Sequence, residues 1–312
     1  MDSSAVVFSK PREIALRRLA LNAPQDGDVV LETLWSGIST GTEKMFFEGS
    51  MPPFPGMGYP LVPGYESVAR VVEAGRDSPR KPGDLVFVPG ANCYRGTAGL
   101  FGATASRLVA AESRVIPVPE ELGERAVLLA LAATAHHAVV RARGRVGLVI
   151  GHGVLGRLVA RIVIALGSPP PVVWERNSAR RDGALGYEVV DEARDATKGH
   201  SAIVEASGSV AAIDAAVSRL ARGGELVLAG FYGERLDIGF VPAFMREISL
   251  HIAAEFRPED VEAVLRLVSG GRLSLDGLLT HRASSTDAPA AYRTAFEDPD
   301  CLKMIIDWRL AA

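Results

Sequence analysis

The sequence of 312 residues contains only two cysteines, Cys93 and Cys301, which lie far apart in the chain. This number excludes a disulfide framework and a zinc ribbon, and it suits a reducing compartment. The formal net charge is −3, and no block of basic residues occurs, so nucleic-acid binding has no electrostatic support. The chain also lacks an apolar run of about 18 residues and the apolar core of a signal peptide. We therefore expect a cytoplasmic protein without an integral membrane segment.

The first third of the chain has little helical periodicity. Short β-branched runs are separated by Gly, Pro and Asp turn signals, and they predict strands at Ala5–Phe8, Val29–Trp35, Val68–Val72 and Leu85–Val88. From about residue 120 the pattern changes to alternating helices and strands, which is typical of a doubly wound parallel sheet. We expect a β-rich domain over 1–125, a dinucleotide-binding domain over 126–254 and a C-terminal segment, 255–312, that returns to the first domain.

A glycine motif opens the second domain. Val146–Ile150 predicts a buried strand, and Gly151, Gly153 and Gly156 follow at the spacing G-x-G-x-x-G. Val154 and Leu155 begin the helix between the second and third glycines, and that helix ends near Gly167. A second short strand, Val172–Trp174, is followed by Glu175. This order of strand, glycine loop, helix, strand and acid is that of the dinucleotide-binding fold.

Each part of the motif has a mechanical reason. Gly151 permits the tight turn, Gly153 lets the backbone approach a pyrophosphate, and Gly156 lets the helix pack against the sheet. The helix N-terminus attracts the anion. Glu175 would accept hydrogen bonds from the ribose hydroxyls and repel a 2′-phosphate, although the adjacent Arg176 weakens that repulsion. The motif therefore predicts an NAD site; the alternative is a tight turn without a ligand.

Two later turns should complete that site. Ser207-Gly208 and Gly230-Phe231 each follow a predicted strand. Because ligands bind at the carboxyl ends of the strands of a parallel sheet, we expect both turns to form walls of the nucleotide site.

The longest irregular stretch, residues 36–65, combines prolines with methionines and aromatic residues. The candidate ligand-binding residues in it are Met45, Phe47, Met51, Phe54, Met57 and Tyr59. Five prolines argue against a central strand or a helix interior, and the aromatic content argues against disorder. We interpret the stretch as a stiff lid over a flat apolar ligand; the alternative is a piece of core.

At this point the chain resembles the medium-chain dehydrogenase/reductase superfamily. The motifs that carry the resemblance are Gly37-Ile38-Ser39-Thr40-Gly41-Thr42, Pro63-Gly64-Tyr65-Glu66, Pro82-Gly83-Asp84-Leu85-Val86 and Lys303. The stretch SGISTGTEKMFFEGSMPPFPGMGYPLVPGYES is similar to one subfamily, the NAD-dependent dehydrogenases of bacteriochlorophyll synthesis. The resemblance implies an α/β fold with a GroES-like distorted β-barrel and a Rossmann domain. It also implies a bacteriochlorophyllide-type tetrapyrrole substrate. A homodimer is a further expectation, and peripheral attachment to the photosynthetic membrane stays an open question.

The chain departs from the zinc-containing members of that superfamily. Where they carry metal ligands this sequence has Ser39, Tyr65 and Ala130, and where they carry a proton-relaying hydroxyl it has Gly41. Serine, tyrosine and alanine do not supply three zinc ligands, so we expect no metal. Only Glu66, beside the second ligand position, is retained.

Without a metal, side chains must assist hydride transfer from a secondary alcohol. Tyr65 and Ser39 should face the reacting oxygen, and Lys44 is the nearest cation in sequence that could lower the pKa of Tyr65. Thr134 matches a superfamily threonine beside the nicotinamide, with a helix-interior threonine as the alternative.

Two other functions stay open: a zinc-free quinone or enone reductase that uses NADPH, and a nucleotide-binding module without catalysis.

Overall fold

The computed structural model describes residues 1–53, 56–76, 78–233 and 235–310. The chain divides into two compact units, the first comprising Met1–Leu129 with Leu279–Ala312 and the second Ala130–Leu278. The division differs from the expected one, because residues 255–278 group with the second unit. Helix α6 (Pro258–Ser269) is held there by Asp260, which accepts hydrogen bonds from His136 and His137 of helix α2 (Leu129–Arg141).

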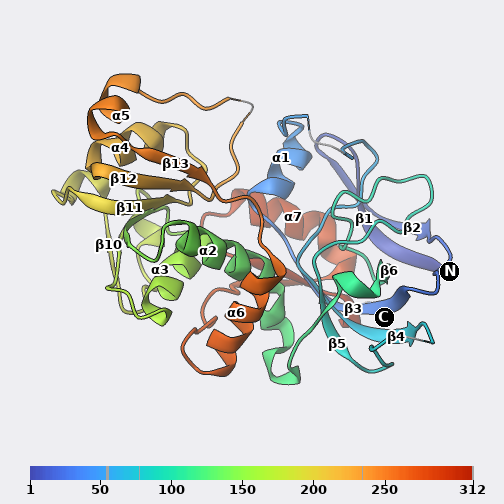
Figure 1. The fold of residues 1–312 in the computed structure, drawn as a ribbon. Helices are drawn as coiled ribbons and strands as arrows, with labels where there is room; N and C mark the ends of the chain where they lie inside the picture. The colour runs from blue at the N-terminus through green and yellow to red at the C-terminus, as the bar shows by residue number, and fades with distance from the viewer. Residues whose placement is uncertain (54–55, 77, 234, 311–312) are drawn as a thin grey trace. The chain divides into compact units, whose positions relative to one another are not determined.

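The first unit is built on two sheets (Figure 1). A hairpin of β1 (Asp2–Lys10) and β2 (Glu13–Ala20) forms the smaller one. The larger has seven strands in the order β14-β15-β3-β4-β5-β7, with β6 paired to β3. Their bounds are β3 Asp28–Gly37, β4 Ser67–Ala74, β5 Leu85–Val88, β6 Arg107–Ala111, β7 Ile116–Pro117, β14 His281–Ser284 and β15 Met304–Asp307. The C-terminal strands β14 and β15 thus return to the β-rich unit, as the sequence analysis expects.

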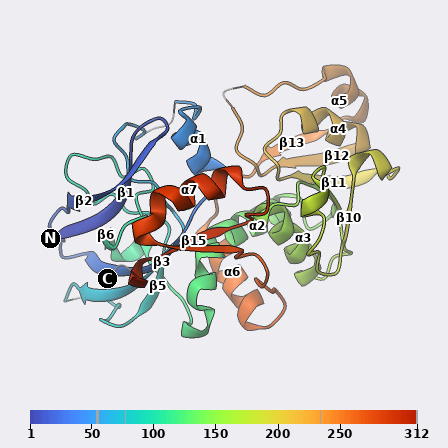
Figure 2. The same cartoon turned by 180° about the vertical axis from the view of Figure 1, so that it is seen from behind.

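Two helices of this unit are absent from the sequence-based expectation. Helix α1 (Thr42–Glu48) lies within the stretch expected to be irregular, and helix α7 (Ala288–Glu297) precedes β15 (Figure 2). Phe46 of α1 and Tyr292 of α7 are buried in one apolar cluster with Phe8. Helix α1 ends at Gly49, whose positive φ of 73° forms a left-handed C-cap. The packing of the two helices therefore fixes the position of the backbone that follows β3.

The second unit contains a six-stranded parallel sheet in the order β10-β9-β8-β11-β12-β13. The strands are β8 Val146–Ile150, β9 Val172–Trp174, β10 Glu188–Val190, β11 His200–Glu205, β12 Leu220–Leu228 and β13 Ser249–Ile252. Helix α3 (Val154–Ala165) connects β8 to β9, α4 (Ala211–Arg219) connects β11 to β12, and α5 (Phe240–Arg246) connects β12 to β13. Helix α2 precedes β8, and α6 follows β13. The chain order reverses at β8, which is the switch point of a doubly wound sheet. The predicted fold class is confirmed.

Candidate active site

The glycine loop between β8 and α3 has the geometry that its sequence predicts. Gly151 has a φ of +98°, and a Cβ there would lie 3.0 Å from Ser207. A Cβ on Gly156 would lie 1.8 Å from the carbonyl oxygen of Gly151, so only glycine lets the helix approach the strand. A Cβ on Gly153, in contrast, would meet no atom within 4 Å. The open space at Gly153 is where a pyrophosphate would approach the backbone.

The start of helix α3 is suited to an anion. Its N-cap residue, Gly153, provides no side-chain hydrogen bond, and its first turn contains no acidic residue. The first backbone N–H groups of the helix are therefore available for a bound phosphate. Val154 is buried and Leu155 is partly buried, so both anchor the first turn. The loop and helix end fit the pyrophosphate of a dinucleotide.

The carboxylate of Glu175 lies beside the glycine loop. Its oxygens accept hydrogen bonds from the backbone N–H of His152, at 3.0 Å, and of Asn177, at 2.8 Å. Arg176 is exposed and forms an ion pair with Glu192 at 2.8 Å. Glu175 is thus held where the ribose of a bound dinucleotide would lie in this fold.

His152, between the first two glycines, is a residue that the sequence analysis did not single out. It is fully buried, and its ring nitrogens contact the carbonyl oxygen of Arg180 at 2.6 Å and the hydroxyl of Tyr187 at 2.9 Å. Burial lowers the pKa of His152 to about 4, so the ring is neutral at physiological pH. A buried neutral histidine therefore ties the glycine loop to the segment after β9.

The two predicted wall turns lie against each other. A Cβ on Gly230 would be 2.6 Å from the Cα and N atoms of Gly208. Glu205, fully buried at the end of β11, accepts hydrogen bonds from the N–H groups of Ser207 and Gly208 at 2.9 and 3.0 Å, and also from the hydroxyl of Tyr232. Glu205, which joins both turns, was not predicted as a site residue from the sequence.

Phe231, predicted as a wall residue, has an exposed side chain. The hydroxyl of Thr134 donates to the carbonyl oxygen of Ala130 at 2.9 Å, one turn earlier in α2. This bond is typical of a threonine inside a helix. A contact of either residue with the nicotinamide stays a prediction.

The first unit brings Ser39 and Tyr65 together. The hydroxyl of Tyr65 donates to Ser39 Oγ at 2.6 Å. Ser39 is buried, whereas Tyr65 is partly exposed and its ring lies against Phe101 at a centroid distance of 5.1 Å. Burial and the neighbouring Glu66 raise the pKa of Tyr65 well above its usual range, so the phenol keeps its proton and acts as a hydrogen-bond donor.

The expected role of Lys44 is wrong. Its ammonium donates to the carbonyl oxygen of Phe296 at 3.0 Å and lies 3.9 Å from Glu48. Helix α1 directs this side chain to those partners, and the pKa of Tyr65 is raised, not lowered. Lys44 therefore does not activate the phenol.

The buried cation of this region is Lys303. Its side chain is 2% exposed, and its Nζ lies 2.9 and 2.7 Å from the two carboxylate oxygens of Glu66. A third hydrogen bond, of 3.0 Å, reaches the carbonyl oxygen of Ile38. Burial raises the pKa of Glu66, and Lys303 opposes that shift. Glu66 and Lys303 thus form a buried ion pair. Glu66 follows Tyr65 in the chain, and Lys303 is hydrogen-bonded to Ile38, which precedes Ser39.

A second buried carboxyl group, Glu43, was not anticipated. Glu43 is fully buried in the first turn of α1. It accepts hydrogen bonds from the Tyr292 hydroxyl at 2.8 Å and from the N–H of Ser39 at 3.3 Å. Burial raises the pKa of Glu43 to about 8, and the charge of Glu66 contributes to the shift. The only signal in the sequence is an acid four residues after Ser39, which is also typical of an ordinary helix start.

Only some side chains of the proposed ligand-binding stretch are accessible to a ligand. Met51 is buried in the apolar cluster that also contains Phe46, so we assign it to the core. Phe54 lies outside the described residues. The other candidates are partly buried and pack on the rim of that cluster: Met45, Phe47, Met57 and Tyr59. Their contact with a substrate stays a prediction.

The donor set does not fit a zinc ion. Ser39 and Tyr65 bind each other, and Glu66 is neutralised by Lys303. A serine hydroxyl and a phenol with a raised pKa are poor zinc ligands. Within the described ranges of the chain, no group of three or more His, Cys, Asp or Glu side chains is placed to hold a metal.

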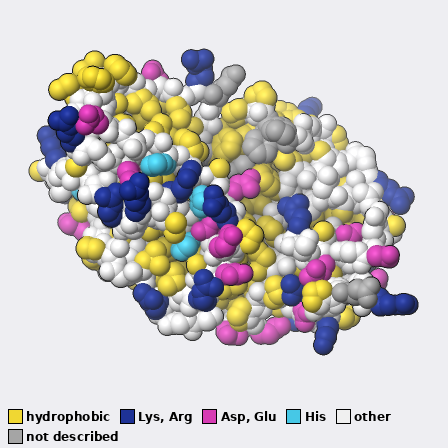
Figure 3. Space-filling view, viewed as in Figure 1, with side chains coloured by type: hydrophobic (Ala, Val, Ile, Leu, Met, Phe, Trp, Pro, Cys, Tyr) yellow, Lys and Arg dark blue, Asp and Glu magenta, His cyan; other side chains and the backbone are white. Residues whose placement is uncertain are grey.

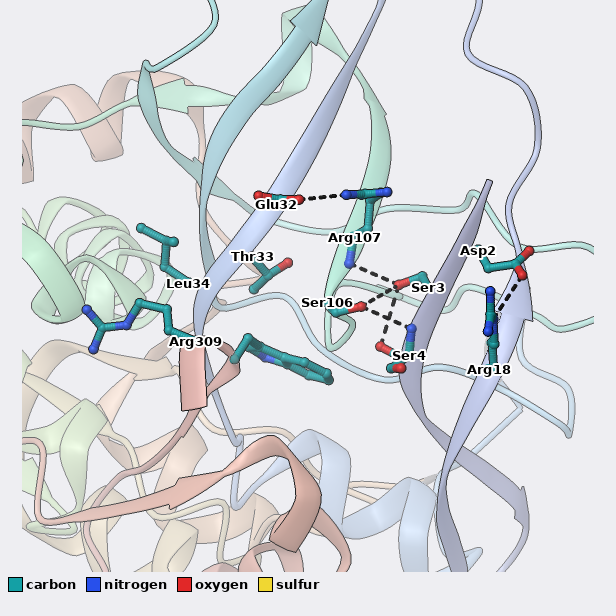
Figure 4. Close-up of a pocket in the computed structure, with 11 residues that line it drawn as sticks. Asp2, Ser3, Ser4, Arg18, Glu32, Thr33, Leu34, Ser106, Arg107 and Arg309 are labelled. Carbon is teal, nitrogen blue, oxygen red and sulfur yellow. Dashed lines mark hydrogen bonds and ion pairs between the residues drawn. The ribbon is translucent and has the colours of Figure 1, made fainter. Parts of the chain in front are cut away.

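A surface pocket of about 450 Å³ lies elsewhere in the first unit (Figure 4). It is lined by Asp2, Ser3, Ser4, Arg18, Glu32, Thr33, Leu34, Ser106, Arg107, Trp308 and Arg309. Each of its arginines is already paired: Arg18 with Asp2, Arg107 with Glu32, and Arg309 with Asp307. Because these charges neutralise one another, the pocket has no group committed to a ligand, and we do not assign a site there.

Comparisons with known proteins agree with this architecture. Residues 25–120 match the alcohol dehydrogenase GroES-like domain. The chain is 53% identical to the "2-desacetyl-2-hydroxyethyl bacteriochlorophyllide A dehydrogenase" of Rhodobacter capsulatus, with 99% of each chain covered. It is also 53% identical to the protein of the same name from Cereibacter sphaeroides, over 100% of both chains. The crystal structure of 2R,3R-butanediol dehydrogenase from Bacillus subtilis has a TM-score of 0.85 at 21% identity, and the match covers 99% of this chain and 100% of that one. The chain therefore belongs to the medium-chain dehydrogenase/reductase superfamily, in the family of these bacteriochlorophyllide dehydrogenases.

Proposed function

We propose that this protein oxidises the 3-(1-hydroxyethyl) group of a bacteriochlorophyllide to a 3-acetyl group, with NAD as hydride acceptor and without zinc. Full-length identity of 53% to proteins named for such a substrate supports the substrate class. The structural observation that carries the proposal is the hydrogen bond of 2.6 Å from Tyr65 to Ser39 Oγ. By the resemblance of the sequence motifs, these two residues stand at positions where zinc-containing members of the superfamily carry metal ligands, which supports the proposal.

The reaction needs two transfers. The carbinol hydrogen leaves as hydride to the nicotinamide, and the hydroxyl proton must pass to a base. While the proton leaves, negative charge develops on the alcohol oxygen, and a preorganised donor stabilises it. Tyr65 keeps its phenolic proton, and in this proposal it turns that proton from Ser39 Oγ to the alcohol oxygen when the substrate binds. Ser39 would then accept a hydrogen bond from the alcohol hydroxyl.

One assay tests the proposal. Purified protein, NAD and the hydroxyethyl pigment should give NADH and the acetyl pigment in equal amounts, and treatment with a chelator should leave the rate unchanged. Loss of turnover together with one removable zinc per chain would overturn the metal-free mode. Reduction of quinones with NADPH in place of this turnover would favour the reductase alternative, and NAD binding without any turnover would favour a nucleotide-binding module.

The cofactor preference should depend on Glu175. Glu175→Ala is expected to shift the NAD-to-NADP ratio of kcat/KM at least tenfold toward NADP (about 1.4 kcal/mol), because a carboxylate there repels the 2′-phosphate. Steady-state kinetics with both cofactors measures the ratio. Glu188→Ala, at an exposed position of β10, is the matched control and should leave the ratio unchanged. A native enzyme that prefers NADP tenfold would contradict this interpretation.

Phe47 should contribute to pigment binding. It is partly buried and packs on Phe8 and Phe296 at ring distances of 5.9 and 5.4 Å. Phe47→Ala is expected to raise the pigment KM several-fold by removing apolar contact area, with little change in the KM for NAD. Phe46→Ala is the control, since Phe46 is core: it should cost about 3–5 kcal/mol of stability and leave the pigment KM of the folded enzyme unchanged. Equal KM values for Phe47→Ala and wild type would exclude the contact.

A homodimer is also proposed. Helix α5 exposes Phe240, Val241, Phe244 and Met245 by 64–74%, and Figure 3 shows the hydrophobic surface over this helix. Apolar side chains gathered in this way are typical of a protein-protein interface. Light scattering of the purified protein would determine the oligomeric state.

Among the described residues, no helix combines the length and apolar composition needed to cross a membrane.

A further inference from the structure

Two arginine side chains are buried in the second unit, on one side of helix α3. Arg157 is 4% exposed and Arg161 is 6% exposed, and residues four apart are neighbours on a helix surface. Both guanidinium groups donate hydrogen bonds to backbone carbonyl oxygens. A carbonyl oxygen carries no full charge, so these bonds satisfy the donors without neutralising the cation. Such a costly arrangement in a nucleotide-binding unit calls for a comparison of what each arginine holds.

Arg157 joins two segments of the candidate nucleotide site. Its Nε donates to the carbonyl oxygen of His152, in the glycine loop, at 3.0 Å. Its Nη2 donates to the carbonyl oxygens of Arg180 and Asp182, after β9, at 3.1 and 2.7 Å. The second segment follows Glu175, the residue expected beside the ribose. Because a guanidinium is planar and its donors have fixed directions, Arg157 sets the position of the glycine loop relative to this segment.

The chain after β9 leaves room for this side chain. Gly183 has a φ of +82°, and a Cβ there would lie 2.4 Å from Arg157 Nη1. Glycine is therefore required at position 183 for the backbone conformation and for the space that the guanidinium occupies. The segment 180–183 thus packs directly against Arg157 and supplies two of its three carbonyl acceptors.

The bond from Arg157 also orients the peptide group between His152 and Gly153. In a planar trans peptide the C=O and the following N–H point in opposite directions. The carbonyl oxygen of His152 is held by the buried guanidinium, so the N–H of Gly153 points away from it. Gly153 is the N-cap of α3, where a Cβ would meet no atom within 4 Å. The N–H of Glu175's partner His152 is fixed separately, by the carboxylate at 3.0 Å.

We propose that Arg157 is a positioning residue for the dinucleotide, which holds the peptide of His152 and Gly153 so that the Gly153 N–H faces the bound pyrophosphate. The inference rests on the proposed function, because it assumes a dinucleotide in this unit. Arg157 acts through the main chain and does not itself contact the reacting atoms. A loop without this bond populates the binding-competent conformation less, and the apparent affinity for the pyrophosphate falls by the same fraction.

Calorimetric titration of the purified protein with ADP-ribose, which contains the pyrophosphate but no nicotinamide, tests the inference. Arg157→Met should weaken binding by about tenfold or more, since hydrogen bonds from charged donors typically contribute a factor of this size. Arg157→Lys keeps the charge but lacks the planar fork of donors, so it should weaken binding as well. In steady-state kinetics the KM for NAD should rise in the same way, while the pigment KM changes less than about twofold.

Arg161→Met is the matched control. Arg161 is equally buried one turn later in α3, but its guanidinium donates to the carbonyl oxygens of Ser274 and Asp276, outside the two segments that Arg157 joins. Its loss should reduce stability and change the Kd for ADP-ribose less than about twofold. Hydrogen exchange of the protein without ligand gives a second readout: residues 152–156 and 180–183 should exchange faster in Arg157→Met than in the wild type or in Arg161→Met.

The outcomes separate the two proposals. A wild type that binds neither NAD nor ADP-ribose would refute the proposed cofactor and the inference with it. A wild type that binds both, with Arg157→Met or Arg157→Lys at the wild-type Kd, would refute the inference alone. An equal loss of affinity in Arg161→Met would show a general effect of removing a buried charge from α3, and would also overturn it. If Arg157→Met does not fold, the Kd of Arg157→Lys decides.

Discussion

Tyr65→Phe is expected to lower kcat for pigment oxidation by about 100-fold, because loss of one preorganised donor to a developing oxyanion typically costs a factor of this size. The substitution removes one hydroxyl group and almost no apolar area, so the pigment KM should change less than about twofold. Steady-state kinetics at saturating NAD measures both constants.

A matched control distinguishes this effect from a general loss of packing. Tyr94 is a buried tyrosine of the same unit, and its hydroxyl donates to the carbonyl oxygen of Gly102 at 2.6 Å. Tyr94→Phe deletes one comparable hydrogen bond at a position without a proposed role in the reaction, so it should reduce stability and leave kcat unchanged. If Tyr65→Phe turns over at the wild-type rate, Tyr65 does not stabilise the reacting oxygen.

The nucleotide-binding half of the fold could be predicted from the sequence because its signals are local. Strand β8, the three glycines, helix α3 and strand β9 follow one another within 29 residues, from Val146 to Trp174. Each element is determined by its own periodicity and turn residues. The loop geometry at Gly151 and Gly156 follows from the steric need for glycine at those positions. The sequence therefore predicted the segment from β8 through α3 to β9 with nearly the observed bounds.

The buried carboxyl groups could not be predicted, because their partners are distant in sequence. Tyr292 lies 249 residues from Glu43, and Lys303 lies 237 residues from Glu66. Nothing in the local pattern around Glu43 distinguishes a buried acid from a solvated one at a helix start. Similarly, Lys44 was chosen as the neighbour of Tyr65 from proximity along the chain, whereas helix α1 directs it to Phe296.

The proline-rich stretch shows a second limit. Its prolines begin at Pro52, after helix α1 has ended at Glu48, so they exclude a helix only from the later part of the stretch. Phe46 and Met51 were therefore not recognised as core residues, although their burial is determined by packing against Phe8 and Tyr292. Amphipathic periodicity cannot be measured reliably over a helix of seven residues, so tertiary packing decides such elements.

The buried ion pair of Glu66 and Lys303 is expected to have a large effect on stability. Lys303→Met should reduce the free energy of unfolding by about 3–5 kcal/mol, because it leaves a carboxyl group buried without its counterion. The loss should be greater at alkaline than at acidic pH. Without Lys303 the folded chain keeps Glu66 protonated to higher pH, whereas the unfolded chain ionises it, so rising pH favours unfolding. Urea unfolding at two pH values measures both effects.

The double variant Glu66→Gln/Lys303→Met separates the loss of the pair from the loss of packing. Glutamine at position 66 carries no charge, so the buried site no longer contains an unpaired ion, and the double variant should recover at least half of the stability lost by Lys303→Met. Its stability should also lose the pH dependence of the single variant. Strictly additive losses would show that the two side chains contribute independently. In that case the distances of 2.7 and 2.9 Å between Lys303 and Glu66 would not represent an energetic coupling, and Lys303 would act mainly through its hydrogen bond to Ile38.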